Sequence, residues 1–481
     1  MDKIATRRAV MQIGKAGTFS LPFSERKVLL GALDVLAING ALAVVAWLRL
    51  GEPDPLAAFA RHPVWFVVLS LLWLLFAGTL DAYDLAMASQ WGRSVRRTGQ
   101  AALLTMVIYA VIPYVTAPIW SSHLALLLFP ATTCVLLAVG RSAYALLISQ
   151  PVFTRPTLIV GAGSAGRAMA ETLMRCGNPC YRIVGFVDDD PAKQGLVLQV
   201  DSAGLRVLGD RRSLRQIVEQ HGISTVVLAI TREVNGELLQ TLIDCLELGV
   251  EIIPMPVLYE QLTGRVPIEH VGRHWHVAMP VEHPLTHPLN RLIKRAFDIV
   301  SASVGLFLLS LAFPLIALAI YVDSPGPIFY TQERVGKGGR RFRVYKFRSM
   351  IPDAEKGRAV WAEKDDPRVT RVGRLLRKTH VDEFPQFLNI IKGEMSAVGP
   401  RPERPEFVEE LAREIPFYRV RHAVKPGMAG WGLVKQGYGA SKEDAILKLQ
   451  YDLYYIKHQS LWLDVVILLK TVVDTLTLRG R

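Results

Sequence analysis

The chain has 481 residues, enough for two or three structural units, and its hydrophobic fraction of 51% is high for a wholly soluble protein. The net charge of +13 suits an anionic partner, such as phospholipid headgroups, a phosphorylated substrate or nucleic acid, without choosing among them. Four scattered cysteines lack the spacing of a zinc ribbon or a disulfide scaffold, which excludes both classes and indicates reduced, structural thiols.

Residues 1–27 are basic and contain no apolar core of the signal-peptide type, so we expect a cytoplasmic tail. Four apolar runs follow within 28–150, each of about the length that crosses a bilayer core as a helix: 28–48, 63–80, 101–119 and 124–140. Arginines lie between the second and third runs and after the fourth, but not between the third and fourth. The positive-inside rule therefore predicts four transmembrane helices with the following domains in the cytoplasm. A buried helical bundle is the alternative.

Strand and helix patterns alternate over residues 151–285, which predicts a Rossmann-like α/β domain with a parallel sheet. Gly161, Gly163 and Gly166 follow one strand and open a helix, and Asp188 ends the next strand. In a dinucleotide-binding turn, such glycines let backbone amides approach a pyrophosphate, and the acid takes a ribose hydroxyl. Both a bound nucleotide and a regulatory or assembly role stay open, because this fold can also bind nothing.

Residues 286–481 begin with a further apolar stretch, 299–322, which has Pro314 at its centre and basic residues on both flanks. Both flanks favour the cytoplasm. A helix that enters the membrane, breaks at a proline and leaves on the same side satisfies them, whereas a straight span would place a basic domain outside. We predict this re-entrant helix-break-helix, and an amphipathic helix over 461–478 that lies in the membrane interface.

The block between these two elements is dense in arginine, acid, proline and glycine. Asp382 and Glu383 are adjacent carboxylates among basic residues, a pattern that a solvated ion-pair surface also produces. Prolines on both sides of Arg401 restrict its backbone and would hold its guanidinium ready for a phosphate. Phosphoryl transfer needs a nucleophile, a divalent cation held by hard oxygens and positive groups for the phosphates, and this block can supply all three.

Six motifs together resemble the monotopic phosphoglycosyl transferase superfamily: Ser324-Pro325-Gly326-Pro327, Gln332-Glu333-Arg334-Val335-Gly336, Lys346-Phe347-Arg348-Ser349-Met350, Asp382-Glu383-Phe384-Pro385-Gln386, Gly399-Pro400-Arg401-Pro402 and Lys425-Pro426-Gly427. The whole chain is similar to the large bacterial members, the polyprenyl glycosylphosphotransferases that start capsule, exopolysaccharide and O-antigen repeats. The resemblance implies a C-terminal α/β catalytic domain on the cytoplasmic side of the bacterial inner membrane. It also implies UDP-sugar as donor, with glucose ahead of galactose, undecaprenyl phosphate as acceptor, UMP as product, Mg2+ as cofactor and a homodimer.

The same resemblance assigns roles to residues. Asp382 would attack the donor's β-phosphate to form an aspartyl phospho-sugar, which the lipid phosphate then displaces. Glu383 would help Asp382 to hold Mg2+ or handle a proton. Phosphate contacts or the shaping of the site would fall to Lys346, Arg348, Arg401, Arg334 and Lys425. Ala429 and Leu433 stand where the family often has Thr and Gln, which puts sugar preference or nucleotide contacts there in doubt.

Two other classes of function fit part of the chain. An NAD-dependent membrane nucleotide-sugar dehydratase or epimerase could share the front half, and Tyr438 and Lys442 have the Tyr-x-x-x-Lys spacing of such enzymes. No second glycine-rich turn lies upstream of that pair within a domain's length, so we interpret the match as chance. A scaffold or nucleic-acid binder would use the positive charge, but no nucleic-acid recognition motif is present, and we predict no such partner.

Overall fold

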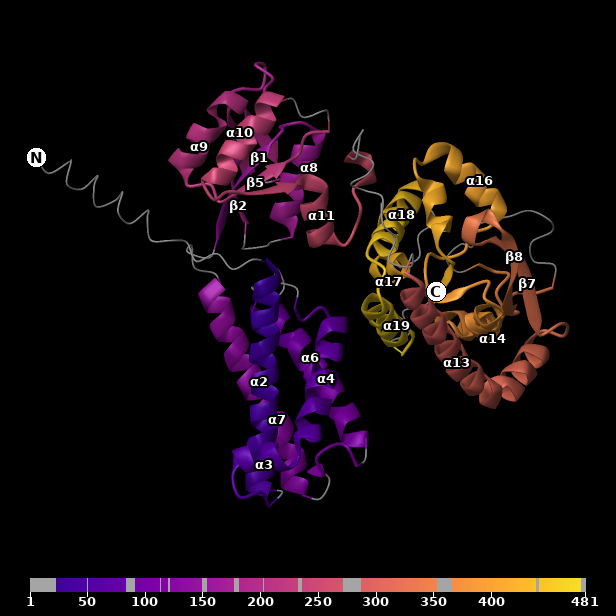
Figure 1. Cartoon of the computed structure of the whole chain (residues 1–481). Helices are drawn as coiled ribbons and strands as arrows, with labels where there is room; N and C mark the ends of the chain where they lie inside the picture. The colour runs from indigo at the N-terminus through magenta and orange to yellow at the C-terminus, as the bar shows by residue number, and fades with distance from the viewer. Residues whose placement is uncertain are drawn as a thin grey trace, which may run out of the picture. The chain divides into compact units, whose positions relative to one another are not determined.

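The computed structural model describes residues 23–49, 51–83, 91–112, 114–119, 122–148, 154–176, 181–201, 203–231, 236–270, 287–352, 366–437 and 441–476. The chain divides into two compact units, Met1–Leu258 and Tyr259–Arg481, which are described separately. Figure 1 shows the helical bundle and the α/β domain of the first unit, and the mixed helices and strands of the second.

The first unit begins with a helical bundle: α2 (Phe23–Arg49), the short α3 (Pro55–Arg61), α4 (Pro63–Thr79), α6 (Trp91–Val111) and α7 (His123–Ile148). Of these described helices, α2 and α7 are long and apolar enough to cross a membrane, and α4 is apolar but has only 17 residues. The expected third run, 101–119, is wrong in its bounds, since α6 starts at Trp91 and ends at Val111. Pro113 disfavours a helical residue before it, which explains the early end.

Arg141 is one of the arginines that follow the fourth apolar run, 124–140, and it lies inside α7 because that helix continues to Ile148. Its side chain is 1% exposed; it forms an ion pair with Asp34 on α2 and donates a 2.7 Å hydrogen bond to the carbonyl of Ala82. The ring of Tyr83 lies 5.5 Å from the guanidinium carbon. A buried charge between apolar helices is costly unless it is paired, so this pair specifies how α2 and α7 face each other.

The rest of the first unit is a six-stranded sheet in the order β3-β4-β2-β1-β5-β6 with helices packed against it. Its elements are β1 (Arg155–Val160), α8 (Ser164–Arg175), β2 (Tyr181–Val187), β3 (Val197–Val200), β4 (Ala203–Gly209), η3 (Arg211–Ser213), α9 (Leu214–His221), β5 (Thr225–Leu228), α10 (Gly236–Glu247) and β6 (Glu251–Pro254). Five strands are parallel, as a Rossmann-like domain requires. β3 pairs antiparallel with β4 and was missed, so the sheet is mixed.

The glycine-rich turn between β1 and α8 owes two of its glycines to packing. Gly161 has a φ of +106°, which favours glycine, and a Cβ there would lie 2.8 Å from the carbonyl oxygen of Ala229. A Cβ on Gly166 would lie 1.9 Å from the carbonyl oxygen of Gly161. Gly163, at the N-terminus of α8, has open space around it. The fold alone therefore requires Gly161 and Gly166, whereas it leaves Gly163 free.

Asp188 also serves the turn itself. Its carboxylate accepts a 2.7 Å hydrogen bond from the amide of Ala162 and a 3.2 Å hydrogen bond from Lys193. The amide of Ala162 in the turn is therefore already hydrogen-bonded within the protein. The prediction that Gly161, Gly163, Gly166 and Asp188 hold a nucleotide stays a prediction.

The second unit contains α13 (Pro288–Asp323), β7 (Phe329–Val335), η6 (Lys337–Gly339), β8 (Arg341–Phe347), α14 (Arg371–Lys378), η7 (Val381–Gln386), α15 (Phe387–Lys392), β9 (Ser396–Val398), α16 (Pro405–Glu414), η8 (Tyr418–Ala423), β10 (Gly427–Ala429), α17 (Trp431–Gln436), α18 (Lys442–Lys457) and α19 (Leu461–Leu476). β7 and β8 form an antiparallel hairpin, and β9 and β10 are parallel. α13 is helical throughout its 36 residues with Pro314 inside, so the chain does not leave the helical state at the proline. Figure 1 shows α13 turning sharply at its lower end and climbing back.

Residues 259–270, which the sequence placed in the α/β domain, belong to the second unit. Val266 is fully buried among side chains of α16, α18 and η8, and its amide donates to the carbonyl of Gln450 at 3.1 Å. The buried carboxylate of Glu260 pairs with Lys457 at 2.9 Å and with His458 at 3.0 Å. These contacts explain why the division falls after Leu258.

We expect Gly166→Ala to destabilise the α/β domain by about 1–3 kcal/mol, because the new methyl group overlaps the Gly161 carbonyl. The matched change Gly163→Ala meets no atom and should leave stability unchanged. Hydrogen exchange of β1 and α8 in the full chain measures the difference, since it reports local stability in a chain with more than one unit. Equal protection in both variants would contradict the packing role of Gly166.

Candidate functional site

Asp382 and Glu383, called the dyad below, lie in the first turn of η7. His380, just before η7, has a φ of +57°, a backbone conformation that is uncommon and strained for a residue other than glycine. Both side chains of the dyad are buried, with 7% and 6% exposure. The dyad is therefore not a solvated ion-pair surface, the alternative that the sequence allowed.

Glu383 is clamped by two cations. Lys346 on β8 donates to its Oε1 at 2.8 Å, and the Arg401 guanidinium donates to Oε1 at 2.6 Å and to Oε2 at 3.1 Å. Such a two-pronged, charge-assisted contact is strong and directional. Although burial opposes ionisation, Arg401 and Lys346 hold the pKa of Glu383 well below its ordinary value. Glu383 is thus a fixed anion.

Asp382 differs from its neighbour. Within the described residues, its carboxylate receives no hydrogen bond and forms no ion pair. Burial and the negative charge of Glu383 raise the pKa of Asp382 to about 6, against the opposing charges of Lys346, Arg377 and Arg401. A buried carboxylate with free oxygens among cations has the chemistry to contact or attack a phosphorylated ligand.

Buried Asn389 fixes the position of the dyad relative to β8. Its Nδ2 donates to the carbonyl of Arg343 at 2.7 Å, and its Oδ1 accepts from the amide of Tyr345 at 3.2 Å. α15, which carries Asn389, directly continues η7. The amide side chain thus holds η7 against the strand on which Lys346 lies, and this brings Lys346 within reach of Glu383.

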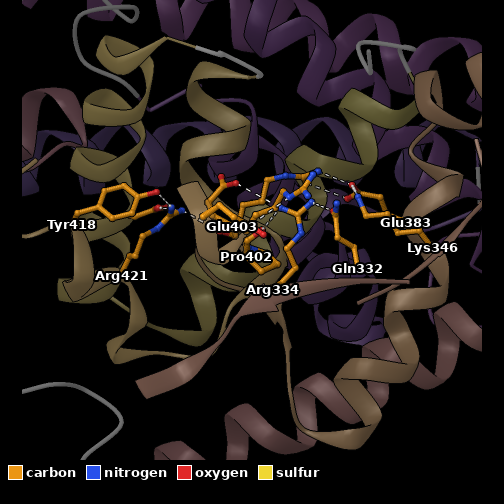
Figure 2. A network of polar contacts seen from close by, with 12 residues as sticks. Gln332, Arg334, Lys346, Glu383, Pro402, Glu403, Tyr418 and Arg421 are labelled. Atoms are coloured by element: carbon orange, nitrogen blue, oxygen red, sulfur yellow. Dashed lines mark hydrogen bonds and ion pairs between the residues drawn. The ribbon is translucent and has the colours of Figure 1, made fainter. Parts of the chain in front are cut away.

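Of the five basic residues assigned to the site, three lie together. Lys346 and Arg401 bind Glu383, while Arg334 donates to the carbonyl of Pro402 at 3.2 Å and lies 3.7 Å from Glu403. Figure 2 shows Arg334 beside Pro402, Gln332 and Glu403, in the polar network that also contains Glu383. Arg334 therefore supports the loop that carries Arg401.

The other two basic residues lie elsewhere. The Arg348 guanidinium donates to the carbonyls of Ser324 and Pro325, so it attaches the end of α13 to β8. Burial and the positive charge of Arg295 lower the pKa of Lys425, and neither member of the dyad is among its main electrostatic neighbours. The structure thus gives Arg348 a shaping role and does not bring Lys425 to the dyad.

Arg377 on α14 was missed as a site residue. Its positive charge acts on Asp382, and its Nε donates to Ser349 Oγ at 3.0 Å. α14 comes this close to the chain after β8 because position 373 is glycine; a Cβ there would lie 2.0 Å from the carbonyl oxygen of Ser349. In the sequence, Arg377 is one of several basic residues that closely precede Asp382. That pattern alone does not show which of them lies near the Asp382 carboxylate.

The dyad alone is not a complete metal site. Among the described residues, no group of three or more His, Cys, Asp or Glu side chains is arranged to hold a metal ion. Mg2+ usually takes one or two protein carboxylates and completes its coordination with water and substrate phosphates. Asp382 and Glu383, with hard oxygen donors and a free carboxylate on Asp382, fit Mg2+ that binds together with a diphosphate.

Comparison with known proteins adds an independent observation. The sequence model described as bacterial sugar transferase matches residues 289–478, which include the dyad and all five basic residues above. A second model, described as a CoA-binding domain, matches residues 79–256, which include the six-stranded sheet. The six-stranded sheet and most of the second unit thus each correspond to a known family.

Three curated relatives illustrate the likeness. The UDP-N-acetylgalactosamine-undecaprenyl-phosphate N-acetylgalactosaminephosphotransferase of Aeromonas hydrophila is 44% identical over 245 residues, 51% of this chain and 57% of that protein. The UDP-glucose:undecaprenyl-phosphate glucose-1-phosphate transferase of Escherichia coli (strain K12) is 42% identical over 186 residues, 38% of this chain and 40% of that protein. The UDP-galactose-lipid carrier transferase of Erwinia amylovora is 30% identical over 360 residues, 69% of this chain and 71% of that protein. The chain thus spans little more than half of the Aeromonas relative.

We expect Glu383→Gln to lower the pKa of Asp382 by about 1–2 units, because a neighbouring negative charge disappears and two cations are released. A water-soluble diazo reagent esterifies only protonated carboxyl groups. In the metal-free protein, labelling of Asp382, read by peptide mass spectrometry, should therefore fall off at lower pH in the variant. Asp366, whose pKa Arg368 holds at about 2 although burial opposes it, is the internal control and should not change. An unchanged Asp382 profile would contradict the coupling.

Proposed function

This chain belongs to the bacterial sugar transferase family, and on that premise we propose that it transfers a sugar 1-phosphate from a UDP-sugar to undecaprenyl phosphate, with Asp382 as nucleophile. The observation that carries the proposal is the contrast within the dyad. Asp382 is buried with no partner among the described residues, while Glu383 is held by Lys346 and Arg401. An ion-pair scaffold would leave no such carboxylate free.

The proposed reaction has two displacements. An oxygen of Asp382 attacks the donor's β-phosphorus, the bond from that phosphorus to the bridging oxygen breaks, and UMP leaves with the electron pair. The product is an aspartyl phospho-sugar. An oxygen of undecaprenyl phosphate then attacks the same phosphorus, and Asp382 leaves as a carboxylate. No oxidant or reductant is needed, and the sugar stays attached to its phosphate throughout.

The neighbours of Asp382 supply charge and position. Lys346, Arg377 and Arg401 place positive charge beside the carboxylate, which favours binding of a diphosphate and offsets the charge of two approaching anions. Mg2+, with Asp382 and Glu383 as its protein ligands, would neutralise further charge on the diphosphate. Glu383 keeps Arg401 and Lys346 in place, since it binds both.

Both ends of α13 are tied to one compact domain, which supports the re-entrant arrangement. Near its start, Lys294 pairs with Asp464 on α19 at 2.9 Å. At its end, Asp323 accepts from the amide of Val372 on α14 at 2.8 Å, and Arg348 holds Ser324. A straight helix of 36 residues would be about 54 Å long and would carry these ends to opposite sides of a bilayer core about 30 Å thick. We therefore propose that α13 enters and leaves the cytoplasmic face of the inner membrane, which would place the dyad near the carrier's phosphate.

The donor is proposed to be a UDP-hexose. Glucose is the expectation from the sequence, and the names of the relatives above add N-acetylgalactosamine and galactose. The NAD-dependent dehydratase gains no support. Lys442 is an exposed residue at the start of α18 that pairs with Glu414 at 2.6 Å, and Tyr438 lies outside the described residues.

Membranes containing the chain should convert undecaprenyl phosphate and at least one radiolabelled donor among UDP-glucose, UDP-galactose, UDP-N-acetylgalactosamine and UDP-N-acetylglucosamine into a labelled lipid. Because Asp382 supplies the attacking oxygen, Asp382→Asn should lower the rate by about 10^4-fold or more. Extraction of the lipid and scintillation counting give the rate.

Asp188→Ala is the matched control, since it removes a half-buried aspartate far along the chain from the dyad, in the α/β domain. It should keep nearly full transfer in vitro. Normal lipid-linked product from folded Asp382→Asn would end the covalent scheme, and loss of transfer in folded Asp188→Ala would show that the α/β domain takes part in turnover.

A further inference from the structure

The loop that carries Arg401 is fastened through its carbonyl oxygens. Pro400 and Pro402 have no N–H group, so the main chain around Arg401 has few donors of its own. Three successive carbonyls accept hydrogen bonds from three different segments: Pro400 from the amide of Gly427 at 2.9 Å, Arg401 from Arg421 at 3.1 Å, and Pro402 from Arg334 at 3.2 Å. Two of these three anchors are arginine side chains.

Arg421 on η8 is itself held rigidly. It is 6% exposed, donates to the hydroxyl of Tyr418 at 2.7 Å and to the carboxylate of Asp452 on α18 at 2.8 Å, and lies 5.1 Å from the centre of the Tyr418 ring. A guanidinium pays a large desolvation cost when buried unless its partners are well placed. The same Nη2 that binds Asp452 also donates to the Arg401 carbonyl at 3.1 Å, so the contact with Asp452 orients the donor that holds the loop.

We propose that Arg421 is a positioning residue for the transfer reaction, which holds the main chain of Arg401 so that the Arg401 guanidinium meets both oxygens of Glu383. This role rests on the proposed function. Figure 2 shows Arg421 and Tyr418 at one end of the polar network and Glu383 and Lys346 at the other. Arg401 connects the two ends, because its carbonyl accepts from Arg421 and its guanidinium donates to Glu383.

A small shift of the loop is enough to matter. The two contacts from Arg401 to Glu383 measure 2.6 and 3.1 Å, and hydrogen bonds weaken steeply when distance or angle changes. A misplacement of about 1 Å in a catalytic constellation can cost about 100-fold in rate. The carboxylate of Glu383 would then lose the two hydrogen bonds from Arg401 that hold it beside Asp382.

A double-mutant cycle tests this role. Arg421→Lys keeps a positive charge for Asp452 but cannot reach three acceptors in a fixed plane. It should lower kcat/KM about 10- to 100-fold in the otherwise native chain. In the Arg401→Ala background the same change should cost less than about threefold, because the group that Arg421 positions is gone. A role in folding alone, or direct contact with substrate, predicts equal losses in both backgrounds.

Arg419→Lys, an exposed neighbour in η8, is the matched control and should keep native kcat/KM. Should Arg421→Lys fail to fold, Tyr418→Phe replaces it in the cycle. This change removes one hydrogen-bond acceptor of Arg421 and leaves its ion pair with Asp452. We expect a smaller loss of kcat/KM, which again is larger in the native chain than in the Arg401→Ala background. Equal losses in both backgrounds, or native kcat/KM in a folded Arg421→Lys, would overturn this role alone. Absence of transfer by the native chain with every donor would overturn the proposed function, and this role with it.

Discussion

The ion-pair cluster around Glu383 is the constraint on which the catalytic unit depends. One buried carboxylate accepts hydrogen bonds from Lys346 on a strand and from Arg401 on a loop, and so it joins segments that are far apart in the sequence. Burying these charges would be costly if any partner were missing, which makes the arrangement specific rather than merely stabilising. Because the cations are engaged by Glu383, its neighbour Asp382 is left as a buried carboxylate with free oxygens. The two adjacent acids therefore have different chemical characters although they share one environment.

The apolar helix α13 is connected to the same cluster through a few polar contacts. Arg348 lies two residues after Lys346 and holds the end of α13, while Asp323 binds the first turn of α14, the helix that carries Arg377. The position of the hydrophobic helix and the position of the charged groups around Asp382 are thus set by the same short segments. If the acceptor is a lipid phosphate, as proposed above, such a connection would keep Asp382 at a constant depth relative to the bilayer surface.

The α/β domain illustrates how a motif can have a structural explanation before a functional one. Gly161 and Gly166 are required by close approaches of the main chain, and Asp188 binds an amide of the turn. Of these three glycines, only Gly163 is not required by packing. A bound ligand that needs close approach of the main chain would therefore explain the glycine at that position. Residues 259–270, which the sequence analysis placed in the α/β domain, pack in the second unit, where Val266 and Glu260 are buried against α18.

Local patterns were enough to predict most of the α/β strands, because hydrophobic periodicity needs no distant partner. The combined motifs were enough to indicate a phosphotransferase through family resemblance, and they singled out Asp382 and Glu383 as candidate residues. The sequence also indicated Arg401, whose flanking prolines constrain it locally. It could not separate Arg377 from the other residues of a basic run, place Arg141 inside a helix, or show that Arg348 binds main-chain carbonyls while Lys346 binds a carboxylate. Those assignments depend on which distant atoms satisfy each buried charge, and long-range pairing of that kind is decided only when the chain has folded.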